Sequence, residues 1–325
     1  MGPDPREKGR LPPSRRPFPN DFSLKTEQDI MMIATIIKFL MGGMMVAVTT
    51  PAIAAPFCGE TSRIAALTRK WADPAGPVMI AAHRGGHLKA PENSLAAVDE
   101  AVAAGADFIE TDVHVTTDGV PYIMHDHRVD RTTDGTGVSE DISYADLRKL
   151  RLKGTDAPPP TLQKMLMHTC GRILVDLDMK TDRVGPVIAV IQSLGMLDQV
   201  GLFDSDSTVL RTARQLAPEL QVMTRLTTAT PLDAINRGLA PIRVVHGDPQ
   251  SLTADASRAI AAMPARIWAN TLGDIDAQFA QHSPDICPRL GALRAMGVTT
   301  IQTDQPALLR RYLKKCRLNR KAARP

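Results

Sequence analysis

The chain has 325 residues, which is enough for one α/β barrel of about 250 residues or for two domains of average size. Aromatic residues make up only 4% of the chain, so base stacking on nucleic acid is not expected. The formal charge is +4, but the segment from Arg310 to Pro325 holds eight basic residues and no acids, which leaves the body of the chain acidic. An acidic body also argues against nucleic acid as a substrate. The basic tail is expected to be solvated, with contact to anionic lipid as the alternative.

Residues 1–55 have the composition of a leader rather than of a folded core. Residues 1–30 are polar and proline-rich, and an apolar stretch follows that carries one charge, Lys38, and ends in small residues at Ala54 and Ala55. This pattern predicts a polar leader plus a cleaved signal peptide, and hence export to the periplasm or the medium. The alternative is an uncleaved membrane anchor, because the stretch approaches the roughly 20 residues that a bilayer requires. Membrane contact is expected only through this segment or the basic tail.

Four cysteines follow the leader: Cys58, Cys170, Cys287 and Cys316. None lies in a C-x-x-C pair, so a structural zinc site is not predicted. An oxidising compartment would permit two disulfides, and a Cys58–Cys316 bridge would tie the two ends of the mature domain together. Buried free thiols are the alternative, since pairing cannot be read from spacing.

An N-terminal extension, residues 56–77, precedes an alternation of short apolar runs with helix-like segments. A helix is predicted after Asn93, as its N-cap, up to Gly105, and two others over residues 186–194 and 307–318. The predicted strands are residues 78–82, 107–113, 173–178, 200–203, 221–225, 243–246, 266–270 and 298–302. Eight βα units predict a single-domain (β/α)8 TIM barrel over residues 78–313, followed by the basic tail, residues 314–325. An open doubly wound sheet is the alternative, but no G-x-G-x-x-G follows the first strand.

Carboxylates gather at the ends of two predicted strands. Glu110 and Asp112 are two residues apart and so share one face of a strand, and Asp176, Asp178 and Lys180 share a face of the next barrel strand. Neighbouring buried anions need a compensating cation, and oxygen ligands suit Mg²⁺ or Ca²⁺. Ordinary surface acids, and a simple pair between Asp178 and Lys180, are the structural alternatives.

Two histidines leave apolar strands at the same end of the predicted barrel. His83 follows VMIAA and His125 follows PYIM, and together they suit general acid–base chemistry near neutral pH. Arg84 offers a planar fork for phosphate oxygens. The set indicates metal-assisted cleavage of a phosphodiester. Three further histidines are expected to support the site or lie at the surface: His87, His114 and His127.

An ordered series of motifs resembles the glycerophosphodiester phosphodiesterase family over about residues 78–313. The segments that carry the resemblance are HRG (83–85), PENS (91–94), IETDVHVTTDG (109–119), HDHRVDRTTDGTG (125–137), the D-x-K of residues 178–180, WAN (268–270) and GVTTIQTDQP (297–306). The resemblance implies a (β/α)8 barrel that uses one divalent cation, Ca²⁺ or Mg²⁺, to hydrolyse glycerophosphodiesters to glycerol 3-phosphate and an alcohol.

The resemblance also implies a role for each matching residue. It makes His83 and His125 the acid–base pair, has Glu92 orient a neighbouring side chain, and assigns metal binding to Glu110, Asp112 and Asp178 and substrate binding to Arg84, Lys180 and Trp268, the last in a glycerol pocket. Asp178 departs from the pattern, because glutamate is usual there, and Asp176 is a potential substitute.

Two other functions are compatible with the fold. A related barrel phospholipase, phospholipase D-like or phosphoinositide-cleaving, would act on intact or lyso-lipid and should carry an apolar rim. The segments TTDGTGVSED (132–141) and KGTDAPPP (153–160) are polar instead. A non-catalytic barrel that binds a phosphorylated ligand should have lost a histidine or a carboxylate, and none is missing. The sequence therefore favours hydrolysis of a water-soluble diester.

Overall fold

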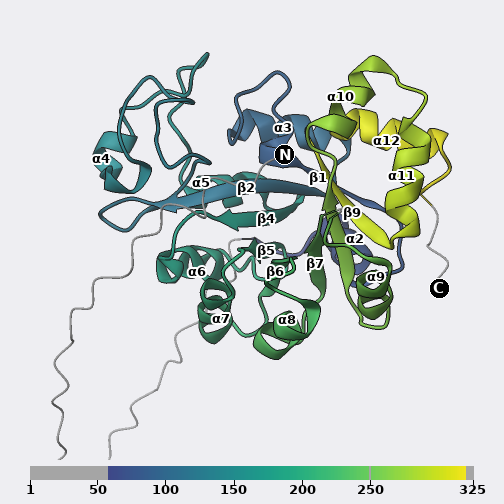
Figure 1. Cartoon of the computed structure of the whole chain (residues 1–325). Coiled ribbons are helices and arrows are strands. Elements are labelled where there is room, and N and C mark those ends of the chain that lie inside the picture. Colours follow the sequence, from purple (N-terminus) through teal and green to yellow (C-terminus); the bar gives the residue numbers. More distant parts are fainter. Residues whose placement is uncertain (1–57, 249, 320–325) are drawn as a thin grey trace, which may run out of the picture. The chain divides into compact units, whose positions relative to one another are not determined.

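The computed structural model describes residues 58–248 and 250–319 (Figure 1). The predicted signal peptide or anchor lies outside these residues, as does the end of the basic tail. Within the described part of the chain, no helix is both long and apolar enough to cross a membrane.

Eight parallel strands close into a barrel, as predicted. The first strand pairs with both the second and the last, which leaves no open edge between them. Each strand begins and ends within two residues of its predicted bounds. The eight are β1 (Met79–Ala82), β2 (Phe108–Val115), β4 (Leu174–Met179), β5 (Val200–Phe203), β6 (Gln221–Leu226), β7 (Val244–Gly247), β8 (Arg266–Asn270) and β9 (Val298–Thr303).

The strands read as short apolar runs because both of their faces are buried. One set of side chains fills the barrel interior: Met79, Ala81, Phe108, Leu174, Phe203, Met223, Val244 and Trp268. The alternate residues face outward and form the larger core with the helices, as Ile80, Ile109 and Val175 do.

Helices follow the strands around the barrel, and α6, α7 and α8 lie next to one another in Figure 1. The helix predicted after residue 93 is present, but its N-cap is Ser94, whose hydroxyl accepts a hydrogen bond from the Ala97 amide (3.1 Å). Asn93 makes tertiary contacts instead, so that part of the prediction is wrong. The helices around the barrel are α3 (Leu95–Ala104), α5 (Leu162–Thr169), α6 (Val184–Ser193), α7 (Ser207–Leu216), α8 (Leu232–Leu239), α9 (Ala254–Ala261), α10 (Asp274–Gln281), α11 (Ile286–Ala295) and α12 (Pro306–Lys315).

An excursion between β2 and α5 was not predicted. It begins with β3 (Pro121–Ile123), which pairs antiparallel with β2, and it includes η4 (Ser139–Asp141) and α4 (Tyr144–Leu147). It has a small core of its own, formed by Tyr122, Met124, Val129 and Leu147. The excursion matters for function because His125 lies at its start.

The N-terminal extension forms α2 (Ser62–Ala72), which covers the end of the barrel where the strands begin. The Trp71 ring packs edge-on against Phe108, with ring centroids 5.1 Å apart. The fully buried Arg266 holds α2 in place, because its guanidinium donates to the Trp71 and Thr299 carbonyls (both 2.9 Å) and to that of Lys70. The extension therefore completes the barrel core.

Two disulfides are present, Cys58–Cys170 and Cys287–Cys316. The predicted Cys58–Cys316 bridge is wrong, and so is the alternative of free thiols. Cys58 lies beside Cys170, which follows α5, and its amide donates to the carbonyl of Leu194, which follows α6 (3.0 Å). Cys316 follows α12, which packs on α11, the helix that carries Cys287. The Cys287–Cys316 bridge thus joins two helices in contact, whereas the Cys58–Cys170 bridge ties the segment before α2 to the end of α5.

Candidate active site

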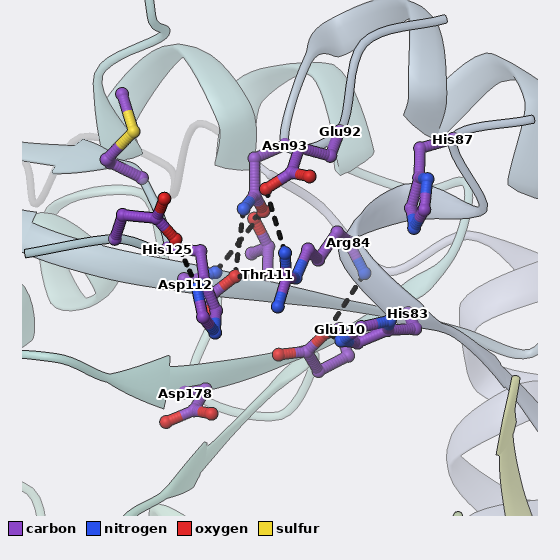
Figure 2. Close-up of polar contacts among 12 residues, drawn as sticks. His83, Arg84, His87, Glu92, Asn93, Glu110, Thr111, Asp112, His125 and Asp178 are labelled. Carbon is purple, nitrogen blue, oxygen red and sulfur yellow. Dashed lines mark hydrogen bonds and ion pairs between the residues drawn. The ribbon is translucent and has the colours of Figure 1, made fainter. Parts of the chain in front are cut away.

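Three carboxylates meet at the ends of β2 and β4, the end of a TIM barrel at which active sites form. Glu110 and Asp112 come from β2, and Asp178 comes from β4, directly opposite Asp112 in the pairing of the two strands. One oxygen from each lies within 4.8 Å of the others, and the three can be followed in Figure 2. Glu110 and Asp112 are 3% and 1% exposed, so this is a buried acidic group and not a surface patch.

The electrostatics of this group fit a divalent cation. Burial, together with the charges of Asp112 and Asp178, raises the pKa of Glu110 well above its ordinary value. Oδ1 of Asp112 is buried and accepts no hydrogen bond from the residues that the structure describes, although the Lys180 ammonium lies 3.0 Å away. A bound cation would favour ionised Glu110 and give Asp112 Oδ1 a ligand contact. An all-oxygen donor set is the one that Mg²⁺ and Ca²⁺ prefer.

Lys180 bridges two of the three carboxylates. Its Nζ lies 2.6 Å from Asp178 Oδ2 as well as 3.0 Å from Asp112 Oδ1, so the pairing with Asp178 weighed from the sequence is present. Burial alone would oppose ionisation of Asp112, but Lys180, His125 and Arg84 hold its pKa below the ordinary value. Asp176 lies opposite Glu110 in the pairing of β2 and β4, but it is outside the set of three whose oxygens lie within 4.8 Å of one another.

A strained turn after β1 brings Arg84 to the carboxylates. Arg84 has φ +50, a left-handed conformation that is uncommon outside glycine and is concentrated at functional sites. Its amide donates to Glu110 Oε2 (2.9 Å), and its guanidinium donates to Glu92 (2.9 Å). Gly85 follows at φ +87, and a Cβ there would lie 2.8 Å from the Ala97 Cβ. The H-R-G sequence therefore reflects a turn that only glycine can complete.

Asn93 fixes the position of Asp112. Its side-chain amide donates to Asp112 Oδ2 (2.8 Å), and its carbonyl oxygen accepts from the Thr111 hydroxyl (2.7 Å), as Figure 2 shows. Asn93 has φ +59, which asparagine tolerates better than most residues. Three consecutive residues thus have different roles: Glu92 accepts from Arg84, Asn93 donates to Asp112, and Ser94 caps α3.

His83 and His125 are each oriented by a carboxylate. Nδ1 of His83 lies 2.6 Å from Asp304 Oδ1, and Nδ1 of His125 lies 2.7 Å from Asp126 Oδ1. Because an ionised carboxylate only accepts hydrogen bonds, Nδ1 is the donor in both pairs and Nε2 is the nitrogen that can exchange a proton. Burial, helped by Arg84 and Lys180, lowers the pKa of His125, against the opposing pull of Asp112. The shift in pKa favours the neutral ring of His125.

Comparison with known proteins identifies the family of the chain. The model of the glycerophosphoryl diester phosphodiesterase family matches residues 83–264, which is more than half of the chain. The chain belongs to this family. Rat glycerophosphodiester phosphodiesterase 1 is 41% identical over 116 residues, which cover 33% of this chain and 35% of that protein. The chain thus matches about a third of the length of this curated relative.

Two solved structures share the fold of this family member. A glycerophosphodiester phosphodiesterase from Agrobacterium tumefaciens is 28% identical with a TM-score of 0.60, and the match covers 71% of this chain and 98% of that one. A phosphodiesterase from Oleispira antarctica is 22% identical with a TM-score of 0.63 and covers 73% and 97%. The predicted barrel and the predicted family are thus both confirmed.

In this family member, Arg131 joins the excursion to the turn after β1. It donates to Asp126 Oδ1 (2.9 Å) and to Glu92 Oε2 (2.8 Å), and its hydrogen bonds lower the pKa of Asp126 to about 2. Arg131 therefore holds Asp126, which orients His125. It also holds Glu92, which accepts a hydrogen bond from Arg84. Sequence reasoning missed Asp126, Arg131 and Asp304, although all three lie inside segments that carried the resemblance.

The strands opposite the carboxylates bring a second polar group to the same end of the barrel. The Arg225 guanidinium donates to both oxygens of Asp248 (2.9 and 2.7 Å), and His246 Nε2 lies 3.1 Å from Asn270 Oδ1. Burial and the charge of Arg225 lower the pKa of His246 to about 4. The sequence analysis did not single out this group, of which only Asn270 lies in a quoted motif, WAN (268–270).

Trp268 lies deeper in the barrel than the carboxylates. Its side chain is 2% exposed and packs on Phe108, with ring centroids 5.4 Å apart, and its indole N–H donates to Gln302 (2.9 Å). The structure does not bring it into the polar cluster of His83, Glu110, Asp112, His125 and Asp178. Its contact with a glycerol group stays a prediction.

Proposed function

We propose that the chain is a metal-dependent phosphodiesterase that hydrolyses glycerophosphodiesters to glycerol 3-phosphate and an alcohol. The observation that carries the proposal is the meeting of two carboxylate-oriented histidines with a three-carboxylate group that fits a hard cation. The Oleispira antarctica relative was solved with its product, sn-glycerol-3-phosphate, which supports the same product here.

The carboxylates Glu110, Asp112 and Asp178 would hold the cation, which would neutralise charge at phosphorus and acidify the C2 hydroxyl of the glycerol group. The lowered pKa of His125 favours its neutral form, and we assign it to remove the proton of that hydroxyl. The hydroxyl oxygen then bonds to phosphorus while the bond from phosphorus to the alcohol breaks. Nε2 of His83 gives its proton to the departing alcohol oxygen.

The first step leaves a cyclic phosphate, a protonated His125 and a His83 without its Nε2 proton. Water then attacks phosphorus and gives a proton to His83, while His125 returns its proton to the glycerol oxygen. Both histidines recover their starting state, and the net reaction consumes one water. Arg84 and Lys180 lie at the edge of the carboxylate group, where their charges would bind the phosphate oxygens.

The surface favours a water-soluble diester over an intact lipid. Among the described residues, the exposed large apolar side chains are Leu88, Met167 and Leu216, and they come from three separate segments. They do not form the continuous apolar rim that a lipid-cleaving enzyme would need.

The decisive variants are His125→Ala and Glu110→Gln, with His127→Ala as the matched control because His127 is an exposed histidine two residues away. Release of glycerol 3-phosphate from glycerophosphocholine is measured with a coupled dehydrogenase, and folding is checked by circular dichroism. We expect the first two variants to lose at least about 100-fold in turnover, and the control to match the wild type. Near-normal turnover in either folded variant would refute the assignment.

We also propose that the chain is exported. The signal-peptide pattern of the leader supports this, and so do the two disulfides, which form and persist in oxidising compartments. N-terminal sequencing of the protein from a fractionated cell tests the proposal. A mature chain that begins after Ala54 or Ala55 is expected, and an unprocessed cytosolic chain would contradict it.

A further inference from the structure

A second group of potential metal ligands lies beside the carboxylate group. Oδ1 of Asp304 lies 2.6 Å from His83 Nδ1 and 3.1 Å from His87 Nε2, and the three donor atoms lie within 4.8 Å of one another. The side chains of His83, His87 and Asp304 are 16%, 25% and 31% exposed. An ion from solvent can therefore reach all three.

Orientation of His83 does not account for this group. One imidazole on the Asp304 carboxylate is enough to fix the ring of His83, yet His87 shares the same oxygen. The carboxylate itself is firmly placed, because the Asp304 amide donates to Asp276 Oδ2 (2.7 Å), and Asp276 is 5% exposed and also accepts from the Thr303 hydroxyl (2.7 Å). The second histidine is the feature that points to a ligand.

The donor chemistry differs from that of the carboxylate group. Two imidazole nitrogens and one carboxylate oxygen form a set typical of Zn²⁺, which is bound tetrahedrally at about 2.0–2.2 Å. Donors around such an ion lie about 3.3 Å apart, so the His83–Asp304 pair would need to open by less than about 1 Å. Ca²⁺ and Mg²⁺ prefer the all-oxygen group of Glu110, Asp112 and Asp178. The two neighbouring groups therefore select different cations.

We propose that His83, His87 and Asp304 form an inhibitory site for Zn²⁺, with water as the fourth ligand. Binding displaces the Nδ1 proton of His83 to solvent and places the metal on that nitrogen. The one remaining ring proton is then on Nε2, and giving it to the departing alcohol would leave an imidazolate anion, so the first step is blocked. His83 can no longer pass a proton in both directions, and turnover stops.

The effect on turnover rests on the proposed function, but occupancy of the site does not. Hydrolysis of glycerophosphocholine is measured in saturating Mg²⁺ while Zn²⁺ is added to the wild type, to His87→Asn and to the control His127→Asn. Without Zn²⁺, we expect all three to turn over equally. We expect His87→Asn to need about tenfold more Zn²⁺ for half inhibition, since loss of a ligand weakens metal binding to at least the extent seen for a supporting group. His127→Asn should match the wild type.

Binding is measured separately with Co²⁺, whose visible absorption bands report four-coordinate binding without any need for turnover. We expect these bands in the wild type and in His127→Asn, and their loss in His87→Asn, with thermal unfolding confirming that each variant is folded. Equal Zn²⁺ inhibition of the wild type and His87→Asn, or relief of inhibition by a tenfold excess of Mg²⁺, would overturn the proposal. If no protein turns over glycerophosphocholine, the proposed function fails, and the Co²⁺ bands still decide whether the site exists.

Discussion

Replacing Asn93 by glycine separates its contact with Asp112 from the helix-capping role that its sequence position suggests. Glycine tolerates the φ of +59 at this residue, so the change removes the side chain without introducing backbone strain. The two short bonds lost are one to an ionised carboxylate (2.8 Å) and one from the Thr111 hydroxyl (2.7 Å), and a longer one from the Asp112 amide (3.4 Å) is lost with them. The two short bonds contribute about 1.5–3 and 0.5–1.5 kcal/mol, so the free energy of unfolding should fall by about 2–4.5 kcal/mol.

Ser94→Ala is the matched control, because Ser94 provides the cap of α3 and does not touch the carboxylates. Ser94→Ala should lower the free energy of unfolding by about 1 kcal/mol and leave turnover near that of the wild type. Asn93→Gly should in addition lower kcat for glycerophosphocholine, because Asp112 is no longer held. Urea unfolding and initial rates measure the two effects. The reasoning is wrong if Asn93→Gly costs no more stability than Ser94→Ala and keeps the wild-type kcat.

Three further predictions follow from other parts of the structure. The pKa of His246 falls from 6.5 to about 4 on folding, so the folded state favours the neutral ring. The free energy of unfolding should therefore drop as the pH falls from 6.5 to 4, by at most about 3 kcal/mol. Urea unfolding at several pH values should show a flatter dependence for His246→Gln, and an unchanged one would contradict the buried neutral ring. Asp178→Glu adds the methylene that the family usually has, and we expect half-maximal activity at a lower Mg²⁺ concentration; a metal titration giving a higher one would count against Asp178 as a ligand. Trp71→Ala should lower stability by about 3 kcal/mol and leave kcat unchanged, as measured by urea unfolding and initial rates, and an undiminished stability would show that α2 is not part of the core.

The barrel strands were predictable because each is an apolar run buried on both faces, a pattern that is local in sequence. The three-residue strand β3 was too short to carry such a pattern. Asn93 and Ser94 are both good helix caps, and only the nearness of Asp112 in the fold decides between them. No local signal could separate the two.

Pairings made by closure of the barrel were beyond the sequence. Asp304 meets His83 because β9 pairs with β1, with Ala82 opposite Thr303. The role of Asp304 therefore depends on contact between the first and last strands of the barrel. The pairing of the cysteines depends in the same way on which segments of the chain pack together. Glu110, Asp112 and Asp178 were accessible, because strand alternation and the family resemblance both select them.

The most direct test of the central claim follows hydrolysis of glycerophosphocholine by ³¹P NMR with chain that has been treated with EDTA and then given Ca²⁺ or Mg²⁺. We predict no reaction in EDTA, and after the metal is restored the diester signal should be replaced by that of glycerol 3-phosphate. Turnover that persists in EDTA, or formation of phosphocholine instead of glycerol 3-phosphate, would contradict the proposed metal-dependent cleavage.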